Sequence, residues 1–308
     1  MQAHPSASHA EATSHQSDAF HPLNSYAWDA YSQGGQDGIL HEILRRLGVF
    51  DADREKWCVE FGAWDGVHLS NTCNLIREHG FRAVMIEADT KRYKQLCGNF
   101  PGDEVVKVNR LVTLDGDARL DRILGETDLP EDFDMLSIDI DSCDYHVWQS
   151  LENYRPKLVI IEFNPTIPVD IPYVQPPDFT VNQGNGVKAI DDLAQEKGYR
   201  TVCIQGGNLI AVREDFLDRV TNATPPPVED LADTGARNFV FVGYDGTVLS
   251  NFDELPFHWH PTTIKTEDIQ VLPRFLRHYT GNYSPLHWFA FGALDYWRRF
   301  KRLLRTGR

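Results

Sequence analysis

The sequence predicts an α/β fold in which helices cover both faces of a mainly parallel β-sheet. Short apolar runs without polar alternation indicate strands that are buried on both faces. Segments of helical character separate these runs, and such alternation along a chain is typical of a parallel sheet. The predicted strands are 57–61, 83–87, 105–108, 135–139 and 158–163, and the predicted helices between or before them are 39–47, 69–79, 90–98, 117–125 and 144–153. The first of these helices follows Ser32-Gln-Gly-Gly-Gln-Asp37, which has the polar character of a helix-capping start.

The pattern changes after residue 163. Residues 164–184 are rich in Pro and Asn and predict a loop, which a helix at 187–197 follows. Two apolar runs, 200–204 and 208–212, then flank Gln205-Gly-Gly, and a Gly-Gly between two such runs indicates a β-hairpin. The sequence therefore predicts five parallel strands, a helix and a terminal hairpin.

The two ends of the chain differ from this central region. Residues 1–24 are rich in Ala, Ser and His and contain few large aliphatic residues, so they predict a disordered tail. The run Pro225-Pro-Pro227 marks a break near the end of the main domain, which we place at 25–221. Residues 222–308 form a C-terminal extension, with a second hairpin over 238–242 and 247–249 and helices at its end.

Composition restricts the classes of partner. The net charge of −15 argues against binding to nucleic acid, because a phosphate backbone would be repelled. The five cysteines are odd in number and form no C-x-x-C pair, which favours reduced thiols in a cytoplasmic protein. We expect neither a signal peptide nor a membrane-spanning segment, because no apolar stretch is long enough.

A glycine-containing turn follows the first strand in Val59-Glu-Phe-Gly-Ala-Trp-Asp-Gly66. Gly62 and Gly66 allow a tight turn and a close approach of the backbone to a ligand. Glu87 ends the next strand, at the place where an acid accepts hydrogen bonds from ribose hydroxyls in Rossmann-type sheets. The alternative is a structural turn with a solvated acid at the strand end. Trp64 and Glu60 disfavour a diphosphate in this turn, so a cationic nucleoside such as S-adenosylmethionine fits the residues better.

Several motifs together carry a resemblance to a known family. They look like the FkbM-type family of class I S-adenosylmethionine-dependent methyltransferases over about 32–212. The motifs are the glycine turn above, Ile86-Glu-Ala-Asp89, Leu136-Ser-Ile-Asp-Ile-Asp-Ser-Cys-Asp144 and Ile160-Ile-Glu-Phe-Asn-Pro165. The resemblance implies a Rossmann-like, seven-stranded sheet with a terminal hairpin, and O-methylation of a hydroxyl on a sugar, a glycan or a related metabolite.

The same resemblance implies a cofactor pocket. Gly62, Ala63 and Gly66 would cradle S-adenosyl-L-methionine, Glu87 would hold its ribose, and Asn109 would lie near its adenine. We expect Glu60, Asp65 and Asp139 to belong to the same pocket. One departure stands out, because Asp139-Ile-Asp141-Ser142 replaces the family's usual Asp-x-Glu-Gly.

Acidic residues cluster after the fourth and fifth strands. Asp139 and Asp141 are two residues apart, as are Glu162 and Asn164, so each pair points to one side of an extended chain. Asp139, Glu162 and Asn164 resemble by position the metal ligands of catechol-type O-methyltransferases, which predicts an Mg²⁺ site. Helix capping together with cofactor contact is the alternative.

We expect Asp139, Asp141 and His146 to be the catalytic residues. Asp141 or His146 would remove the proton of the acceptor hydroxyl, and Asp139 would orient the cofactor or the metal. His146 could equally be a plain surface or packing histidine, and His68 just past the glycine turn has the same ambiguity.

The C-terminal segment 288–305 mixes aromatic residues with a basic end. Such a helix could make peripheral contact with an anionic membrane, or it could pack its aromatic face on the domain, and packing is favoured. Two rival functions remain for the whole chain. One is a metal-dependent glycosyltransferase that uses Asp139-x-Asp141, and the other is a non-catalytic binding module with a methyltransferase fold.

Overall fold

The computed structural model describes residues 20, 22–232, 239–256 and 260–306. The chain divides into two compact units, Met1–Thr234 and Gly235–Arg308, and each is described by itself. Most of the tail predicted over 1–24 lies outside the described residues. Its end is an exception and corrects the prediction: Leu23 is buried in the short 3-10 helix η1 (Leu23–Tyr26), and Asn24 Nδ2 donates to the carbonyl of Ile204 at 2.9 Å.

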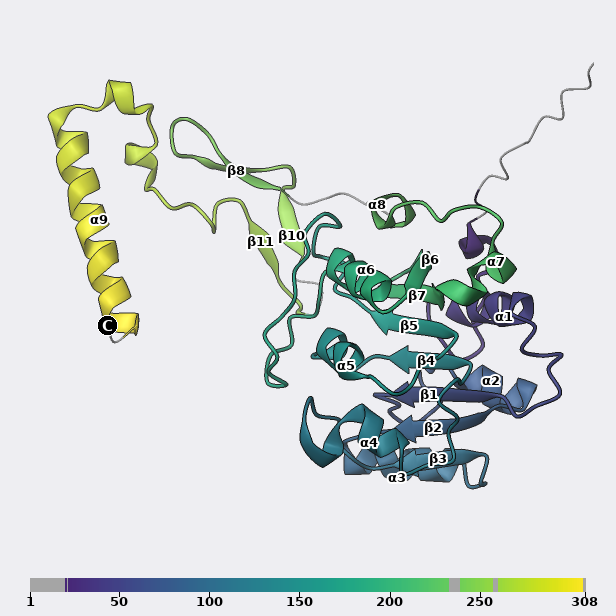
Figure 1. Ribbon diagram of the computed structural model, residues 1–308. Coiled ribbons are helices and arrows are strands. Elements are labelled where there is room, and N and C mark those ends of the chain that lie inside the picture. Colours follow the sequence, from purple (N-terminus) through teal and green to yellow (C-terminus); the bar gives the residue numbers. More distant parts are fainter. Residues whose placement is uncertain (1–19, 21, 233–238, 257–259, 307–308) are drawn as a thin grey trace, which may run out of the picture. The chain divides into compact units, whose positions relative to one another are not determined.

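Seven strands form the central sheet of the first unit (Figure 1). Their order is β3-β2-β1-β4-β5-β7-β6, in which β1 to β5 pair in parallel and β7 is antiparallel to both of its neighbours. The strands are β1 (Trp57–Phe61), β2 (Arg82–Ile86), β3 (Val105–Val108), β4 (Met135–Ile138), β5 (Leu158–Glu162), β6 (Tyr199–Gln205) and β7 (Asn208–Arg213). This is a Rossmann-like, mainly parallel seven-stranded sheet with an antiparallel hairpin at its end, so the predicted fold class is confirmed.

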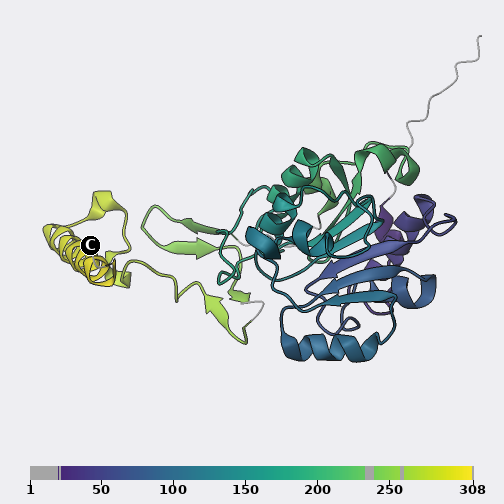
Figure 2. The same ribbon diagram turned by 60° about the horizontal axis from the view of Figure 1, so that its bottom comes forward.

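Helices cover both faces of the sheet, as can be followed in Figures 1 and 2. Alternate strand residues sort into two apolar cores: Val84 and Ile86 belong to one, whereas Ala83 and Met85 belong to the other. One core includes α1 (Gln36–Arg46), α2 (Cys73–His79) and α3 (Thr90–Asn99). The other includes α4 (Leu120–Leu124), α5 (Asp144–Ser150) and α6 (Val187–Glu196). Both faces of the sheet are thus buried under helices, which is why the strands do not alternate between apolar and polar residues.

Short elements complete the first unit and move its predicted boundary. They are η2 (Gly116–Ala118), η3 (Glu214–Phe216), α7 (Leu217–Val220) and α8 (Val228–Leu231). Val228 is only 3% exposed and lies in the same core as α6, so the compact unit continues past residue 221. The predicted end of the domain at residue 221 is therefore too early, because α8 still packs on this core.

The second unit contains the predicted hairpin and more. β8 (Val240–Val242) pairs antiparallel with β9 (Val248–Ser250), as the sequence predicts. A further pair, β10 (Glu254–Pro256) with β11 (Thr263–Lys265), was not predicted. Two 3-10 helices, η4 (Arg274–Leu276) and η5 (Thr280–Asn282), precede the long helix α9 (Pro285–Thr306). Across the residues that the structure describes, no helix is both long and apolar enough to cross a membrane.

Candidate functional site

A cavity of about 430 Å³ opens at the carboxyl ends of β1, β2, β4 and β5. The strand order reverses between β1 and β4, and open α/β sheets bind ligands at such a point. The residues that line the cavity are Gln33, Glu60, Phe61, Gly62, Ala63, Trp64, His68, Leu69, Ser70, Asn71, Ile86, Glu87, Ala88, Arg92, Arg110, Leu111, Val112, Asp139, Ile140, Asp141, Ser142, Glu162, Phe179 and Asn182.

Backbone strain gathers around this cavity. Three non-glycine residues of the described chain have positive φ: Trp64 at 50°, Leu69 at 56° and Asp141 at 57°. All three line the cavity. L-residues avoid this region because Cβ crowds the backbone, and such strain concentrates at functional sites. The strain supports the cavity as the functional site independently of its position in the sheet.

Gly62 lets the ends of β1 and β4 approach closely. Its φ is +78°, and a Cβ on it would lie 1.7 Å from the carbonyl oxygen of Asp139. The amides of Gly62 and Ala63 both donate to the carbonyl of Ile86 on β2, at 3.1 Å each. The start of the turn is therefore fixed to both neighbouring strands, and its two residues form part of the cavity wall.

Glu60 holds the loop that leads into α2. Its carboxylate is 6% exposed and accepts from the hydroxyls of Ser70 and Thr72 at 2.6 Å each and from the amide of Asn71 at 2.9 Å. Burial raises the pKa of Glu60, whereas the three donors favour its charged form. The sequence predicts a helix over 69–79, but α2 begins only at Cys73. The preceding Ser70-Asn71-Thr72 is not helical, because its polar groups donate to the buried Glu60 carboxylate. Glu60 lines the cavity, but both of its carboxylate oxygens already accept hydrogen bonds from the loop.

Glu87 faces the glycine turn across the cavity wall. It is 6% exposed, and its carboxylate accepts from the amide of Trp64 at 2.8 Å and from the amide of Asp89 at 2.6 Å. Each carboxylate oxygen keeps a free lone-pair direction, because an ionised carboxylate offers about four. A fixed acid beside the turn is the arrangement needed to accept hydrogen bonds from a ribose.

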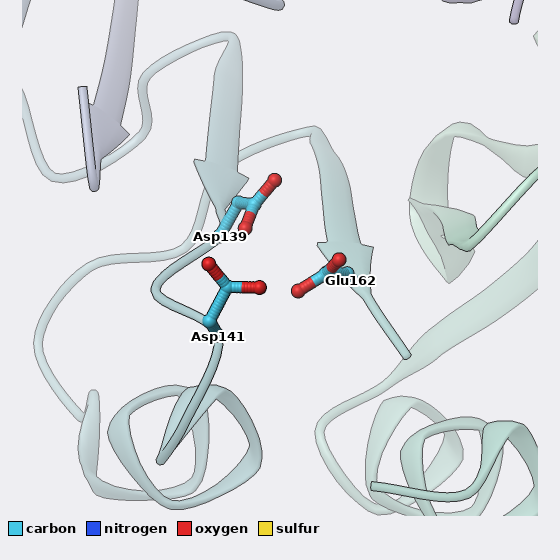
Figure 3. Close-up of side chains that lie close together, drawn as sticks. All are labelled: Asp139, Asp141 and Glu162. Carbon is cyan, nitrogen blue, oxygen red and sulfur yellow. The ribbon is translucent and has the colours of Figure 1, made fainter. Parts of the chain in front are cut away.

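Three carboxylates converge between β4 and β5 (Figure 3). One oxygen from each of Asp139, Asp141 and Glu162 lies within 4.8 Å of the others. Burial, followed by the charge of neighbouring acids, raises the pKa of Asp139 to about 7 and that of Glu162 to about 9. The cluster therefore holds protons at neutral pH unless a positive charge enters.

Asp144 shapes the loop that carries this cluster. Its buried carboxylate accepts from the amides of Ile140 at 2.8 Å and Ser142 at 3.0 Å. Burial raises the pKa of Asp144 to about 6. These bonds turn the chain back at Asp141, the residue held at positive φ, and so present its carboxylate to Asp139 and Glu162 (Figure 3). The capping alternative, predicted for Asp141 or Ser142, is not found, because the start of α5 has no side-chain cap; Asp144 lies in the first turn of α5, as expected.

Two predicted polar residues take other roles. Asn164 does not join the acid cluster, because its amide donates to the carbonyl of Gln183 and accepts from the amide and hydroxyl of Thr166. The carboxylates that do lie together are those of Asp139, Asp141 and Glu162, and a ligand role for Asn164 stays a prediction. His146 does not line the cavity, and its Nε2 lies 2.8 Å from the carbonyl oxygen of Gln175, so this placement does not support the predicted catalytic role.

Three predicted cofactor residues also lie outside the cavity lining. Asp65 accepts from the amides of Val67 and His68 and so closes its own turn. A Cβ on Gly66 would meet Leu96 and Phe100, so this glycine serves packing against α3.

Asn109 is the third predicted cofactor residue that lies outside the cavity lining. Its Nδ2 donates to the carbonyls of Glu87 at 2.8 Å and Ala88 at 3.2 Å, and it therefore braces the chain behind Glu87.

Sequence reasoning missed Asn71. It is 4% exposed, its Nδ2 donates to Ser137 Oγ at 3.2 Å, and its Oδ1 has no partner although the residue lines the cavity. A buried acceptor without a donor is costly and indicates a ligand group. No pattern in the sequence marks Asn71, because its burial depends on the loop bound by Glu60.

The rim of the cavity carries an aromatic and cationic cluster that was also missed. The Arg92 guanidinium lies 3.5 Å from the centroid of the Trp64 ring, and His68 packs against the same ring at 5.5 Å. Of the two histidines considered, His68 is therefore the one at the cavity. Trp64 and His68 are exposed, so this cluster faces whatever enters the cavity.

Comparison with known proteins gives weak likenesses. No family model matches the chain, and no curated protein matches it. An O-methyltransferase from Bacillus cereus, solved in complex with SAH, is 18% identical with a TM-score of 0.40, over 62% of this chain and 87% of that one. An O-methyltransferase family protein from Burkholderia thailandensis is 14% identical with a TM-score of 0.36, over 58% of each chain.

A third structure, assigned as a sarcosine dimethylglycine methyltransferase from Galdieria sulphuraria, is 15% identical with a TM-score of 0.36, over 54% of this chain. This chain spans only 61% of the length of that protein. Likeness at this level says nothing about what the present chain binds or does. Its fold is defined by the strand order described above.

Proposed function

We propose that this protein transfers a methyl group from S-adenosyl-L-methionine to a hydroxyl. The observation that carries the proposal is the pairing of two features at one cavity. Glu87 stands fixed beside the glycine turn, and a crowded group of acids lies across from it at the ends of β4 and β5. The first feature suits a ribose, and the second requires a positively charged guest.

The residues of the cavity fit this cofactor. Glu87 would accept from the ribose hydroxyls, the orphaned Oδ1 of Asn71 would accept from the amino group, and Asp139 would face the positive charge. Leu111 and Val112 add an apolar wall suited to the base. When bound, the cofactor supplies a methyl group on a positively charged sulfur.

Removal of the acceptor proton falls to a group at the open side of the cavity. Asp141 is exposed, lines the cavity and belongs to the acid cluster, so it is the first choice. His68 is the second, since His146 is directed elsewhere. Alignment of the acceptor oxygen with the methyl group would provide much of the acceleration, and the fixed cavity wall serves that purpose.

A sugar or glycan hydroxyl is the acceptor class that we propose, together with membership of the FkbM-type family. Both rest on the sequence resemblance. The cavity supports the acceptor class, because Asp141 and Glu162 are carboxylates able to accept from hydroxyls beside the exposed ring of Trp64. The divalent metal predicted at Asp139, Glu162 and Asn164 stays a prediction. The clustering of the Asp139, Asp141 and Glu162 carboxylates supports it, since hard cations prefer all-oxygen sites.

Calorimetry with S-adenosylhomocysteine and S-adenosylmethionine tests the proposal. We expect both to bind, and Glu87→Ala to weaken binding by roughly 1.5–3 kcal/mol, the range for a hydrogen bond to a charged group. Lys94→Ala, which changes an exposed residue of α3 away from the cavity lining, is the control. Repeating each titration with Mg²⁺ and with a chelator decides the metal prediction.

Two outcomes would reverse the assignment. Tight binding of uridine diphosphate with Mn²⁺, in place of the methyl donor, would favour a glycosyltransferase built on Asp139 and Asp141. Binding of the cofactor without release of S-adenosylhomocysteine from any of a panel of sugars and glycans would favour a non-catalytic binding module.

A further inference from the structure

Helix α9 presents a continuous apolar face to its surroundings. At about 100° per residue, the residues of this face all fall within an arc of about 120°, which places them on one side of the helix. Their side chains are 50–76% exposed, an unusual state for so many large apolar groups together. The residues are Leu286, Phe289, Tyr296, Trp297, Phe300, Leu303 and Leu304.

The other side of α9 is the side held by its own unit. Tyr283 stacks on His287 with ring centroids 5.6 Å apart and meets the edge of Trp288 at 5.2 Å. Farther along, the guanidinium of Arg298 donates to the carbonyl of Val271. These contacts leave the apolar face pointing away from the elements that hold the helix.

Positive charge borders this face. The helix carries five Arg and Lys residues after Asp295, whereas the chain as a whole has a net charge of −15. At about 100° per residue, Arg299 and Lys301 fall on the two opposite edges of the apolar face. Positively charged side chains therefore border the exposed apolar face of α9.

Aromatic and basic residues in this arrangement match a lipid surface. Trp and Tyr favour the headgroup level of a membrane, and bordering Arg and Lys residues attract anionic lipids. A second copy of the helix is the main rival, since the spacing also suits a helix pair. Two copies would bring Lys301 against like charge, and Asp295, the one acid of α9, already pairs with Arg299 of its own helix at 2.9 Å, so it is not available to a partner helix.

We propose that α9 binds the surface of a membrane that contains anionic lipids. Its apolar face enters the boundary between headgroups and acyl chains, and Arg299 and Lys301 meet lipid phosphates at its edges. Its charges keep it in the plane of the interface. The inference does not depend on the reaction proposed for the first unit.

Sedimentation of the full chain with vesicles tests this proposal. We expect binding to vesicles of phosphatidylcholine with about one-third phosphatidylserine, and much weaker binding to phosphatidylcholine alone. Phe289→Asp with Phe300→Asp should reduce binding by at least about a hundredfold, because two buried rings are lost. Both residues are exposed, so folding should be retained, as circular dichroism would verify. The matched control is Phe275→Asp with Tyr279→Asp, two exposed aromatics of the same unit outside α9.

A second pair of variants isolates the charge. Removing two positive charges with Arg299→Gln and Lys301→Gln should weaken binding to the anionic vesicles roughly thirtyfold, at about fivefold per charge. Lys91→Gln with Lys94→Gln changes the net charge equally on α3 and should leave binding unchanged. Equal losses in both pairs, or no sedimentation with either vesicle, would refute the proposal. A dimer in light scattering that Phe289→Asp with Phe300→Asp dissociates, without vesicle binding, would assign the face to a second copy.

Discussion

Replacing Gly62 with alanine tests whether the close approach of β1 and β4 builds the cavity. The new Cβ would stand 1.7 Å from the carbonyl oxygen of Asp139, far inside any normal contact. The left-handed backbone alone costs an L-residue roughly 1–2 kcal/mol. The clash is with the backbone of Asp139, so the ends of β1 and β4 must also separate. We expect Gly62→Ala to lower the free energy of unfolding by more than about 4 kcal/mol in total.

Gly80→Ala provides the matched control. Gly80 has a similar φ of +65°, but a Cβ there would meet nothing within 4 Å. Gly80→Ala should lower the free energy of unfolding only by the cost of the left-handed backbone, roughly 1–2 kcal/mol. Urea unfolding followed by circular dichroism measures both variants, and the difference between them isolates the clash.

The same pair links stability to function. Gly62→Ala should weaken S-adenosylhomocysteine binding at least about tenfold, or 1.4 kcal/mol, because the cavity wall moves. Gly80→Ala, at the end of α2, should leave binding unchanged. Equal losses of stability in the two variants, or unchanged binding in a folded Gly62→Ala protein, would refute this account of the turn.

Three further predictions follow from buried polar groups. Asn71→Ala should weaken cofactor binding in calorimetry by roughly 1–3 kcal/mol, because a buried acceptor is lost from the cavity wall. Asp134→Ala should lower the free energy of unfolding in urea by about 3–5 kcal/mol, since its fully buried carboxylate compensates a buried lysine and binds an arginine. Without ligand, the melting temperature should fall as pH rises from about 5 to 8.5. The pKa of Asp139 is raised from 3.8 to about 7 and that of Glu162 from 4.5 to about 9. The folded protein therefore binds protons that the unfolded chain has already released, and this contribution to stability is lost as the pH rises.

Specific results would contradict each of these. Unchanged affinity in Asn71→Ala would mean that its free oxygen faces no ligand group. If Asp134→Ala lowers the free energy of unfolding by less than about 1 kcal/mol, its partners Arg54 and Lys157 are hydrated in the variant and do not need the carboxylate. If Asp139→Asn with Glu162→Gln keeps the full pH dependence of the melting temperature, the decline arises elsewhere in the chain.

The sequence was sufficient for the sheet and for the position of the site. Buried parallel strands appear as unbroken apolar runs, and the carboxyl ends of β1, β2, β4 and β5 are marked by Gly62, Glu87, Asp139 and Glu162. Local spacing also predicted that Asp139 and Asp141 would share a site, although the backbone at Asp141 is left-handed rather than extended. These features depend on residues close in the chain or on the general geometry of parallel sheets.

Only the tertiary structure decided which polar side chains are free to meet a ligand. Asn109, Asn164 and His146 were predicted site residues, yet each is bonded to a segment that folds back on it. Asn71, with nothing in its sequence context to mark it, keeps an acceptor without a donor. Hydrogen-bond partners are chosen by three-dimensional proximity, and proximity between distant segments is the quantity that a sequence pattern does not contain.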